Sequence, residues 1–424
     1  MKIKTIKSTH EEVMALPRAK HKKPVKPNIF FRTLMRLVGL PDLLSARFRY
    51  TFEDKDKLEG GPYFILMNHS SFIDLEIASS ILYPAPMNIV CTTDGLVGKA
   101  WLMRKLGCIP TQKFVSDLSL IHDIRYALTE LRSSVLMFPE AGYSFDGRST
   151  LLPRHLGSLL KSLGVPVLFI KTEGAFSRDP LYNCLQKRKV KVSANVKCIL
   201  TREEAKALSV EEIDNIIDDC FNFDNFDWQY KNNIKITEPF RADGLERVLY
   251  KCAHCGAEGT MRGEGVTLSC SKCGKSYHLN ELGRLEASSG ESEFAHIPDW
   301  YDWERAEVRR EIEDGSYGLD TEVEIGMLVD YKGLYMVGDG RLTHDKDGFR
   351  LYDGEGKLLY EQKTLSSYTL NSDYFWYEIG DVIGIGNRHQ LYYCFPKGNT
   401  PVAKTRLATE ELFKIAMNTH RQDT

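Results

Sequence analysis

Five short apolar runs, separated by helix-like segments, limit most strongly how this chain can fold. They read YFILMN, NIVCTT, SVLMFPE, VPVLFIKT and KVKVSANVKCIL, at residues 63–68, 88–93, 134–140, 165–172 and 189–200. Residues 117–133 repeat apolar side chains at the spacing of an amphipathic helix, namely Ile121, Ile124, Leu128 and Leu131. Strands that alternate with helices predict an α/β layered domain with a central, mostly parallel sheet.

Basic residues are concentrated at the N-terminus. The chain of 424 residues has a net charge of −2, but its first 50 residues hold 12 Lys and Arg against three acidic residues. Residues 1–27 are basic and interrupted by prolines, so we expect them to be flexible. Residues 28–40 predict a short helix with Arg32 and Arg36 four apart, which could lie in a membrane interface or pack on the domain that follows.

The sequence gives no sign of export or of a membrane span. The N-terminal residues contain no apolar core like that of a signal peptide, and no apolar run approaches the roughly 20 residues of a transmembrane helix. We therefore expect a cytoplasmic protein with free thiols, attached to the cytosolic face of a membrane as a peripheral protein.

The segment NHSSFID, residues 68–74, follows the first apolar run and places His69 five positions before Asp74. A histidine can remove the proton from a hydroxyl at neutral pH, and a carboxylate on its other ring nitrogen fixes the tautomer. The two side chains can meet if His69 lies in a loop and Asp74 in the first turn of a helix. Ser71 and Asp74 also fit a helix capping box, in which case His69 would be an ordinary residue at a strand end.

Three later segments favour the catalytic interpretation of His69. They are GKAWLMRKLGCIPTQKF (98–114), FPEAGYS (138–144) and GVPVLFIKT (164–172). Together with the pattern Asn68-His69-x-x-x-x-Asp74, and in this order, they resemble the four motifs of the glycerolphosphate and lysophosphatidic acid acyltransferase superfamily. The resemblance covers residues 55–240, less than half of the chain.

This resemblance implies a role for several residues. His69 would be the general base and Asp74 the carboxylate that orients it. The implied substrate-binding residues are Lys113, Glu140 and Gly142, and we add Arg148 from the loop that follows the third motif. One departure stands out: the chain has Ala141-Gly142-Tyr143 where the family has Gly-Thr-Arg, so an arginine associated with the acceptor phosphate is missing. Arg148 could replace it, or the acceptor could lack a simple phosphate.

The resemblance implies an O-acyltransferase of phospholipid metabolism. An acyl group would move from acyl-CoA or acyl carrier protein to a hydroxyl of a lysophospholipid-like or glycerol-phosphate-like acceptor, with membrane lipid as the surrounding surface. Two alternatives stay open: a catalytically silent protein that binds lipid or acyl carrier and recruits partners, and a thioester hydrolase that uses the same base on water.

Two Cys-x-x-Cys pairs, each followed by glycine, stand at Cys252, Cys255, Cys270 and Cys273. Their spacing predicts a zinc ribbon in which four thiolates hold a structural zinc ion. The segment carries only scattered basic residues, so we expect no nucleic-acid partner. His254 and His278 are not expected to be ligands, because four cysteines complete the site.

The rest of the chain predicts a β-rich, barrel-like region and a closing helix. Hairpin turns are predicted at Asp339-Gly340, Asp347-Gly348 and Asp353-Gly354. The predicted domains are therefore a basic segment (1–52), an acyltransferase domain (53–245), a zinc ribbon (246–289) and a β-rich domain (290–424).

Overall fold

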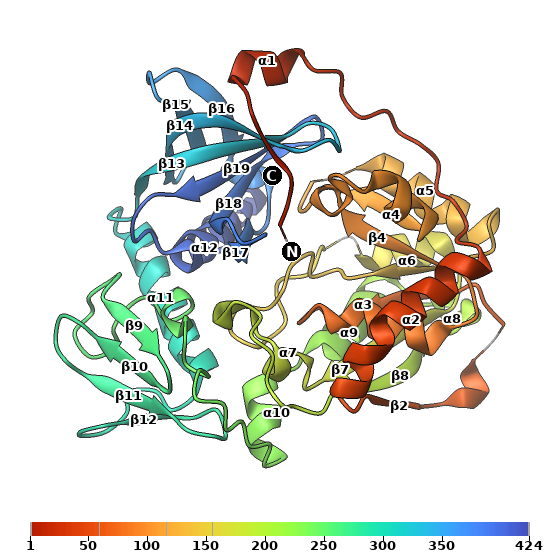
Figure 1. The fold of residues 1–424 in the computed structure, drawn as a ribbon, viewed down its shortest axis with the longest axis horizontal. Coiled ribbons are helices and arrows are strands. Elements are labelled where there is room, and N and C mark those ends of the chain that lie inside the picture. The colour runs from red at the N-terminus through yellow and green to blue at the C-terminus, as the bar shows by residue number, and fades with distance from the viewer. Residues whose placement is uncertain (1, 59, 116, 155, 423–424) are drawn as a thin grey trace. The chain divides into compact units, whose positions relative to one another are not determined.

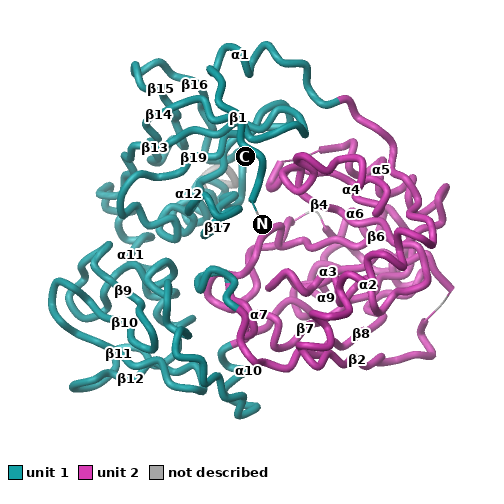
Figure 2. Tube along the Cα trace, viewed as in Figure 1, with its two compact units in different colours: residues 1–19, 181–186, 226–424 teal, residues 20–180, 187–225 magenta. Residues whose placement is uncertain are grey.

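The computed structural model describes residues 2–58, 60–115, 117–154 and 156–422 (Figure 1). The chain forms two compact units (Figure 2). Unit 1 comprises residues 1–19, 181–186 and 226–424, and unit 2 comprises residues 20–180 and 187–225.

Unit 2 is built on a seven-stranded sheet with the order β2-β8-β7-β3-β6-β4-β5. The strands are β2 (Arg49–Phe52), β3 (Phe64–Met67), β4 (Met87–Thr92), β5 (Cys108–Thr111), β6 (Ser134–Met137), β7 (Val167–Glu173) and β8 (Ser193–Leu200). All neighbouring strands are parallel except β7 and β8. The prediction of an α/β domain with a mostly parallel sheet is therefore confirmed.

Helices cover both faces of this sheet. They are α2 (Ile29–Ser45), α3 (Ile73–Leu82), α4 (Ala100–Lys105), α5 (Leu118–Thr129), α6 (Leu156–Leu163), α7 (Ala175–Arg178), α8 (Arg202–Ala207) and α9 (Val210–Phe221). Ile65 and Met67 of β3 pack with α2 and α3, while Phe64 and Leu66 pack with α5, α6 and α9. Because alternate side chains enter two different cores, the strand reads as an unbroken apolar run.

Helix α2 has a buried side and an exposed apolar side. Gly39 and Leu43 are buried, and a Cβ at Gly39 would lie 2.9 Å from Cβ of Glu76 on α3. Several large apolar side chains of the same helix are nevertheless exposed, namely Ile29, Phe30, Leu37, Val38, Leu40 and Leu44. Packing on the domain therefore occupies only one side of the helix.

The prediction that residues 1–27 are flexible is wrong for the part that forms regular secondary structure. In unit 1, β1 (Thr5–Lys7) pairs in parallel with β14, and helix α1 (His10–Ala15) buries Val13. In unit 2, the backbone carbonyl of Val25 accepts a hydrogen bond from the Asn88 side chain. These partners are distant in sequence, so no local pattern could have revealed them.

Unit 1 contains two sheets, which are antiparallel except where β1 pairs with β14. The smaller has the order β12-β11-β10-β9, with β9 (Met261–Glu264), β10 (Thr267–Cys270), β11 (Ser276–Leu279) and β12 (Leu285–Ala287). The larger follows the order β16-β15-β14-β13-β19-β18-β17 and gains β1 beside β14. Its strands are β13 (Leu319–Leu328), β14 (Leu334–Asp345), β15 (Gly348–Asp353), β16 (Leu358–Lys363), β17 (Asn371–Trp376), β18 (Gly380–Asn387) and β19 (Gln390–Pro396). The remaining helices are α10 (Asn225–Lys231), α11 (Ile297–Glu313) and α12 (Val402–Gln422).

The β-rich region and its closing helix are confirmed, but one predicted turn is wrong. Asp339-Gly340 lies within β14, not at its end. A Cβ at Gly340 would collide with the carbonyl oxygen of Tyr352 on the neighbouring strand. Glycine is needed there for close approach of two strands, which has the same sequence signature as a turn.

Candidate active site

The loop between β3 and α3, here called the histidine loop (residues 68–72), brings the predicted pair together. His69 lies in the loop, and Asp74 lies in the first turn of α3. Nδ1 of His69 is 3.1 Å from Oδ2 of Asp74. The side chain of Asp74 is fully buried, whereas that of His69 is 21% exposed. An imidazole with one side on a buried carboxylate and an opening toward solvent has the arrangement of a general base.

The Asp74 carboxylate also holds the loop in shape. Its Oδ2 accepts the backbone N–H of Ser70 at 2.7 Å and that of Ser71 at 3.0 Å. A carboxylate in this place is favoured by the helix N-terminus. The predicted capping box is not formed, because the N-cap of α3 is Phe72 and no side chain caps the helix. The same Oδ2 atom that accepts the loop amides contacts His69, so Asp74 both holds the loop and orients the imidazole.

Glu140 braces the histidine loop from the segment after β6. Its Oε2 accepts the backbone N–H of His69 at 2.7 Å, while its Oε1 accepts the Ser149 hydroxyl and the Thr150 N–H, each at 3.0 Å. Burial raises the pKa of Glu140, although these hydrogen bonds favour its ionised form. Its contacts to the loop show how it fixes His69. Its predicted role toward an acceptor stays a prediction.

Asn68 fastens the start of the loop to β7. Its Oδ1 accepts the N–H of Thr172 at 2.7 Å and the Thr172 hydroxyl at 3.1 Å, and its Nδ2 donates to the Thr172 carbonyl at 3.2 Å. Thr172, Ser149 and Thr150 are therefore part of the site's support. Sequence reasoning missed all three, because a hydroxyl residue in a strand or loop carries no specific signal.

Aromatic rings surround the imidazole. Phe138 stacks on His69 with ring centroids 4.2 Å apart, and Tyr143 lies against it at 4.4 Å. Phe72, which is 55% exposed, lies 6.0 Å from the Tyr143 ring. The position where the resemblance leads us to expect an arginine therefore presents an aromatic ring to the base.

The turn that carries Tyr143 is strained at Ala141. Its φ is +52°, a left-handed conformation that L-residues other than asparagine and aspartate rarely adopt. The family has glycine at this position, which would adopt it without strain. Gly142 has no such need for space, because a Cβ there would meet no heavy atom within 4 Å.

The two predicted cations lie in different surroundings. Arg148 pairs with Asp146, with Nη2 at 2.7 Å and Nε at 2.8 Å from Oδ2, so much of its charge is balanced within the protein. Lys113 lies in the turn after β5, at the same sheet edge as His69 but three strands away. At about 4.8 Å per strand this separation is about 14 Å, so Lys113 could reach only a distant part of a substrate bound at His69.

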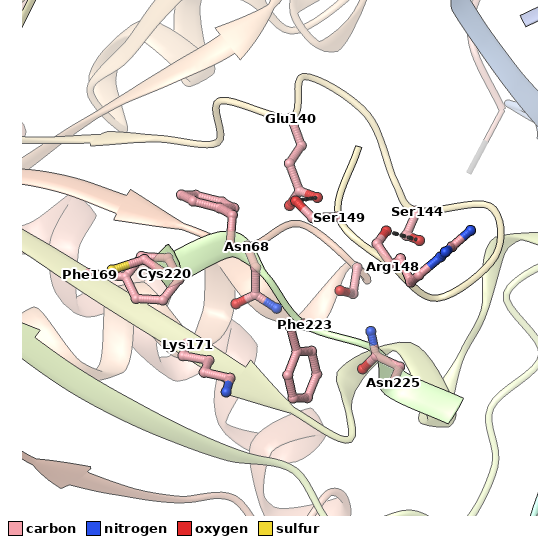
Figure 3. Close-up of a pocket in the computed structure, with 12 residues that line it drawn as sticks. Asn68, Glu140, Ser144, Arg148, Ser149, Phe169, Lys171, Cys220, Phe223 and Asn225 are labelled. Atoms are coloured by element: carbon pink, nitrogen blue, oxygen red, sulfur yellow. Dashed lines mark hydrogen bonds between the residues drawn. The ribbon is translucent and has the colours of Figure 1, made fainter. Parts of the chain in front are cut away.

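A pocket of about 290 Å³, including open space at its mouth, adjoins the histidine loop (Figure 3). Its polar lining comes from Asn68, Ser70, Glu140, Ser144, Arg148, Ser149, Lys171 and Asn225. Its apolar lining comes from Phe169, Cys220, Phe221 and Phe223. The pocket therefore places apolar surface and hydrogen-bonding groups side by side next to the histidine loop.

Residues 49–168, which include this strand, histidine loop and helix, match the Acyltransferase family. Among solved structures, the chain is similar to the 1-acyl-sn-glycerophosphate (LPA) acyltransferase PlsC from Thermotoga maritima. The identity is 18%, the match covers 45% of this chain and 76% of that chain, and the TM-score is 0.34. No curated protein matches the chain.

The four predicted cysteine ligands form a separate cluster in unit 1. The Sγ atoms of Cys252, Cys255, Cys270 and Cys273 all lie within 4.8 Å of one another. Cys252 and Cys273 are 3.8 Å apart, as are Cys255 and Cys270. A tetrahedral zinc ion with Zn–S bonds of about 2.3 Å needs sulfur atoms about 3.8 Å apart, so the cluster fits this metal.

The backbone of the two knuckles is closely similar. Gly256 N–H donates to the Cys252 carbonyl at 2.8 Å, and Gly274 N–H donates to the Cys270 carbonyl at 2.9 Å. Both glycines have a positive φ, +69° and +77°. The glycine after each pair is therefore required by the turn that points two thiols to one side.

Proposed function

We propose that unit 2 transfers an acyl group from a thioester, on coenzyme A or acyl carrier protein, to a hydroxyl of a lipid acceptor, with His69 as the base. The observation that carries the proposal is the contact of 3.1 Å between His69 and Asp74 within a segment that matches the Acyltransferase family. When Nδ1–H donates to Asp74, Nε2 keeps its lone pair. Nε2 makes no hydrogen bond to any residue that the structure describes.

The reaction follows from this arrangement. Nε2 of His69 takes the proton of the acceptor hydroxyl while the oxygen attacks the thioester carbonyl carbon. The Asp74 carboxylate stabilises the imidazolium that forms. The C–S bond then breaks, and the imidazolium returns the proton to the leaving thiolate, which gives an ester and a free thiol. Glu140 and Asn68 act by holding the backbone on either side of the base.

The surroundings of His69 favour a lipid acceptor that carries no phosphate close to the reacting hydroxyl. Tyr143, Phe138 and Phe72 place aromatic surface beside the base. A phosphate one or two carbons from the reacting hydroxyl would meet these rings, because Arg148 is paired and Lys113 is strands away. An acceptor with an apolar or uncharged part next to the hydroxyl suits this surface better.

An acyl-transfer assay on the purified full chain tests the proposal. Labelled acyl-CoA and acyl carrier protein are offered with lysophosphatidic acid, neutral-headgroup lysolipids and glycerol 3-phosphate. We expect His69→Ala to lower the rate of transfer about 1,000-fold, since a general base contributes about 100- to 10,000-fold. His122→Ala, an exposed histidine of the same unit, is the matched control and should transfer at the wild-type rate.

Two other results of this assay would contradict acyl transfer. Release of free fatty acid without an acylated acceptor would make the protein a thioester hydrolase. Binding of donor and acceptor without turnover, unchanged in His69→Ala, would make it a silent binding protein.

We propose that the cysteine cluster holds one structural zinc ion. Four thiolates complete a tetrahedron, so no coordination position is left for a substrate. When bound, zinc supplies folding free energy to this small four-stranded sheet.

We also propose that the exposed side of α2 lies on the cytosolic face of a membrane as a peripheral anchor. The exposed side chains Phe30, Leu37, Val38 and Leu44 support this, and none of the described helices is long and apolar enough to cross a membrane. Vesicle sedimentation of Leu37→Asp/Val38→Asp tests it, with the buried face of α2 left intact. Unchanged sedimentation of this variant would rule out α2 as the main attachment.

A further inference from the structure

A second buried carboxylate lies behind the histidine loop. The Ser71 hydroxyl donates a hydrogen bond to Oδ1 of Asp179, the residue that follows α7. Ser71 is fully buried and Asp179 is 2% exposed. The backbone N–H of Ser71 donates at the same time to Oδ2 of Asp74, at 3.0 Å. One serine therefore joins the catalytic carboxylate to a carboxylate that belongs to no recognised motif.

Asp179 is in turn tied to helix α2 through a buried arginine. Arg178, 2% exposed, has Nη1 at 3.3 Å from Oδ2 of Asp179 and Nη2 at 2.6 Å from Oδ1 of Asp42 on α2. Lys187 also contacts Asp42, at 2.5 Å. A continuous line of hydrogen bonds and ion pairs thus runs from α2, through Arg178, Asp179 and Ser71, to Asp74.

This line has the properties of a positioning device. The Ser71 hydroxyl and amide donate in two directions, so the loop cannot rotate without breaking one bond or the other. Both bonds are buried, and a buried polar group left without a partner is strongly unfavourable. A catalytic pair must be held within about 0.5 Å of its working geometry. A small shift of Ser71 would therefore be felt at the contact between Asp74 and His69.

We propose that Asp179, supported by Arg178 and Asp42, is a positioning residue that holds the histidine loop through Ser71. The packing position of α2 therefore affects the distance between His69 and Asp74. Its catalytic consequence rests on the acyl-transfer function proposed above. Its structural consequence, an ordered histidine loop, does not.

The kinetic test is a double-mutant cycle of Ser71→Ala and Asp179→Ala in the full chain. Each single change is expected to lower kcat about 10- to 100-fold and to leave KM for the acyl donor within about twofold, because contacting residues couple at this level. The double variant should be no slower than the slower single variant. Asp123→Asn, which alters another buried carboxylate of unit 2, is the matched control and should keep the wild-type kcat. Additive losses, or an unchanged kcat in Asp179→Ala, would overturn the proposal.

Hydrogen exchange provides a readout that needs no activity. The Ser70 and Ser71 amides donate to a buried carboxylate, so residues 68–75 should exchange slowly in the wild type. Asp179→Ala should speed exchange of this peptide about tenfold or more, and Asp42→Asn should do so to a smaller extent, while the β9–β12 sheet stays unchanged. Asp179→Asn should lie between wild type and Asp179→Ala, because its amide oxygen still accepts from Ser71.

The two failures can be told apart. A wild-type protein that transfers no acyl group would refute the proposed function, yet the exchange of residues 68–75 would still decide the role of Asp179. Exchange that is unchanged in Asp179→Ala, or that rises equally throughout unit 2, would refute the positioning role whatever the activity.

Discussion

The histidine loop and the cysteine cluster are both built from tight turns beside strands, but they are held in different ways. Asn68, His69, Ser70 and Ser71 each bond to a group elsewhere in unit 2, and the carboxylates of Asp74 and Glu140 are buried. In the cysteine cluster, Cys255 and Cys273 are exposed, and the thiols approach one another at 3.8 Å. Buried hydrogen bonds hold the geometry of the first site, whereas the second gathers four thiols, two of them exposed, in the arrangement of the proposed metal site.

Metal removal should give the largest effect, and it should change the cysteine cluster while leaving the histidine loop unchanged. Structural zinc contributes about 10–16 kcal/mol of apparent binding free energy, so its loss should unfold the β9–β12 sheet. We expect one zinc ion per wild-type chain by elemental analysis, and loss of that ion in Cys255→Ser together with fast hydrogen exchange over residues 250–280. Exchange of residues 68–75 should not change.

Cys184→Ser is the control for this experiment, because Cys184 is a half-buried thiol of unit 1 outside the cluster. It should keep the zinc ion. A wild-type protein without stoichiometric zinc would remove the distinction between a site held by metal and a site held by the fold.

Glu140→Gln should have the next largest effect, confined to the histidine loop. The carboxylate accepts from His69, Ser149 and Thr150, whereas a glutamine amide presents only one acceptor oxygen. At least one buried donor is left unpaired, which costs about 1–3 kcal/mol. We expect a fall of about 2 kcal/mol in the free energy of unfolding and a clear loss of kcat, measured by denaturation and by the acyl-transfer assay.

Glu130→Gln, at the exposed end of α5, is the matched control and should leave both quantities unchanged. If Glu140→Gln kept full stability and lost only affinity for the acceptor, Glu140 would be a substrate-binding residue, and the view of a loop braced from within the fold would fail.

The sequence was informative where the necessary contacts are local or follow a recognised motif. The apolar runs predicted the strands of the central sheet, because a strand with two buried faces has a continuous apolar sequence. The spacing of His69 and Asp74, and of each cysteine pair, spans one turn of chain, so the geometry could be anticipated. Distant motifs were needed to decide whether Asp74 orients a catalytic histidine or belongs to a capping box. In the structure it contacts His69, and α3 has no side-chain cap.

The sequence was uninformative where a residue acts through a partner far along the chain. Asp179 reaches Ser71 across 108 positions, and Arg178 reaches Asp42 across 136. The paired residues of β1 and β14 are even farther apart in the sequence. A buried Arg-Asp dipeptide reads as an ordinary charged loop, so neither the support of the histidine loop nor the order of the N-terminal residues could be predicted.

Glu76→Gln should give the smallest effect. It tests whether the buried charges that support the histidine loop also destabilise the folded protein, because Asp42 of that network lies close to the Glu76 carboxylate. Burial, and then the charge of Asp42, raise the pKa of Glu76 to about 7. From about pH 4.5 to 7 the unfolded chain loses this proton before the folded one does, so the stability of the wild type falls as the pH rises. Glutamine removes that loss. Because Glu76 is only half-buried, the effect should be small. We expect the thermal unfolding midpoint of the Glu76→Gln variant to lie about 2 °C above that of the wild type at pH 8, and to equal it at pH 4.5. Glu130→Gln should show no such difference, and an equal shift at both pH values would mean that packing, not charge, is responsible.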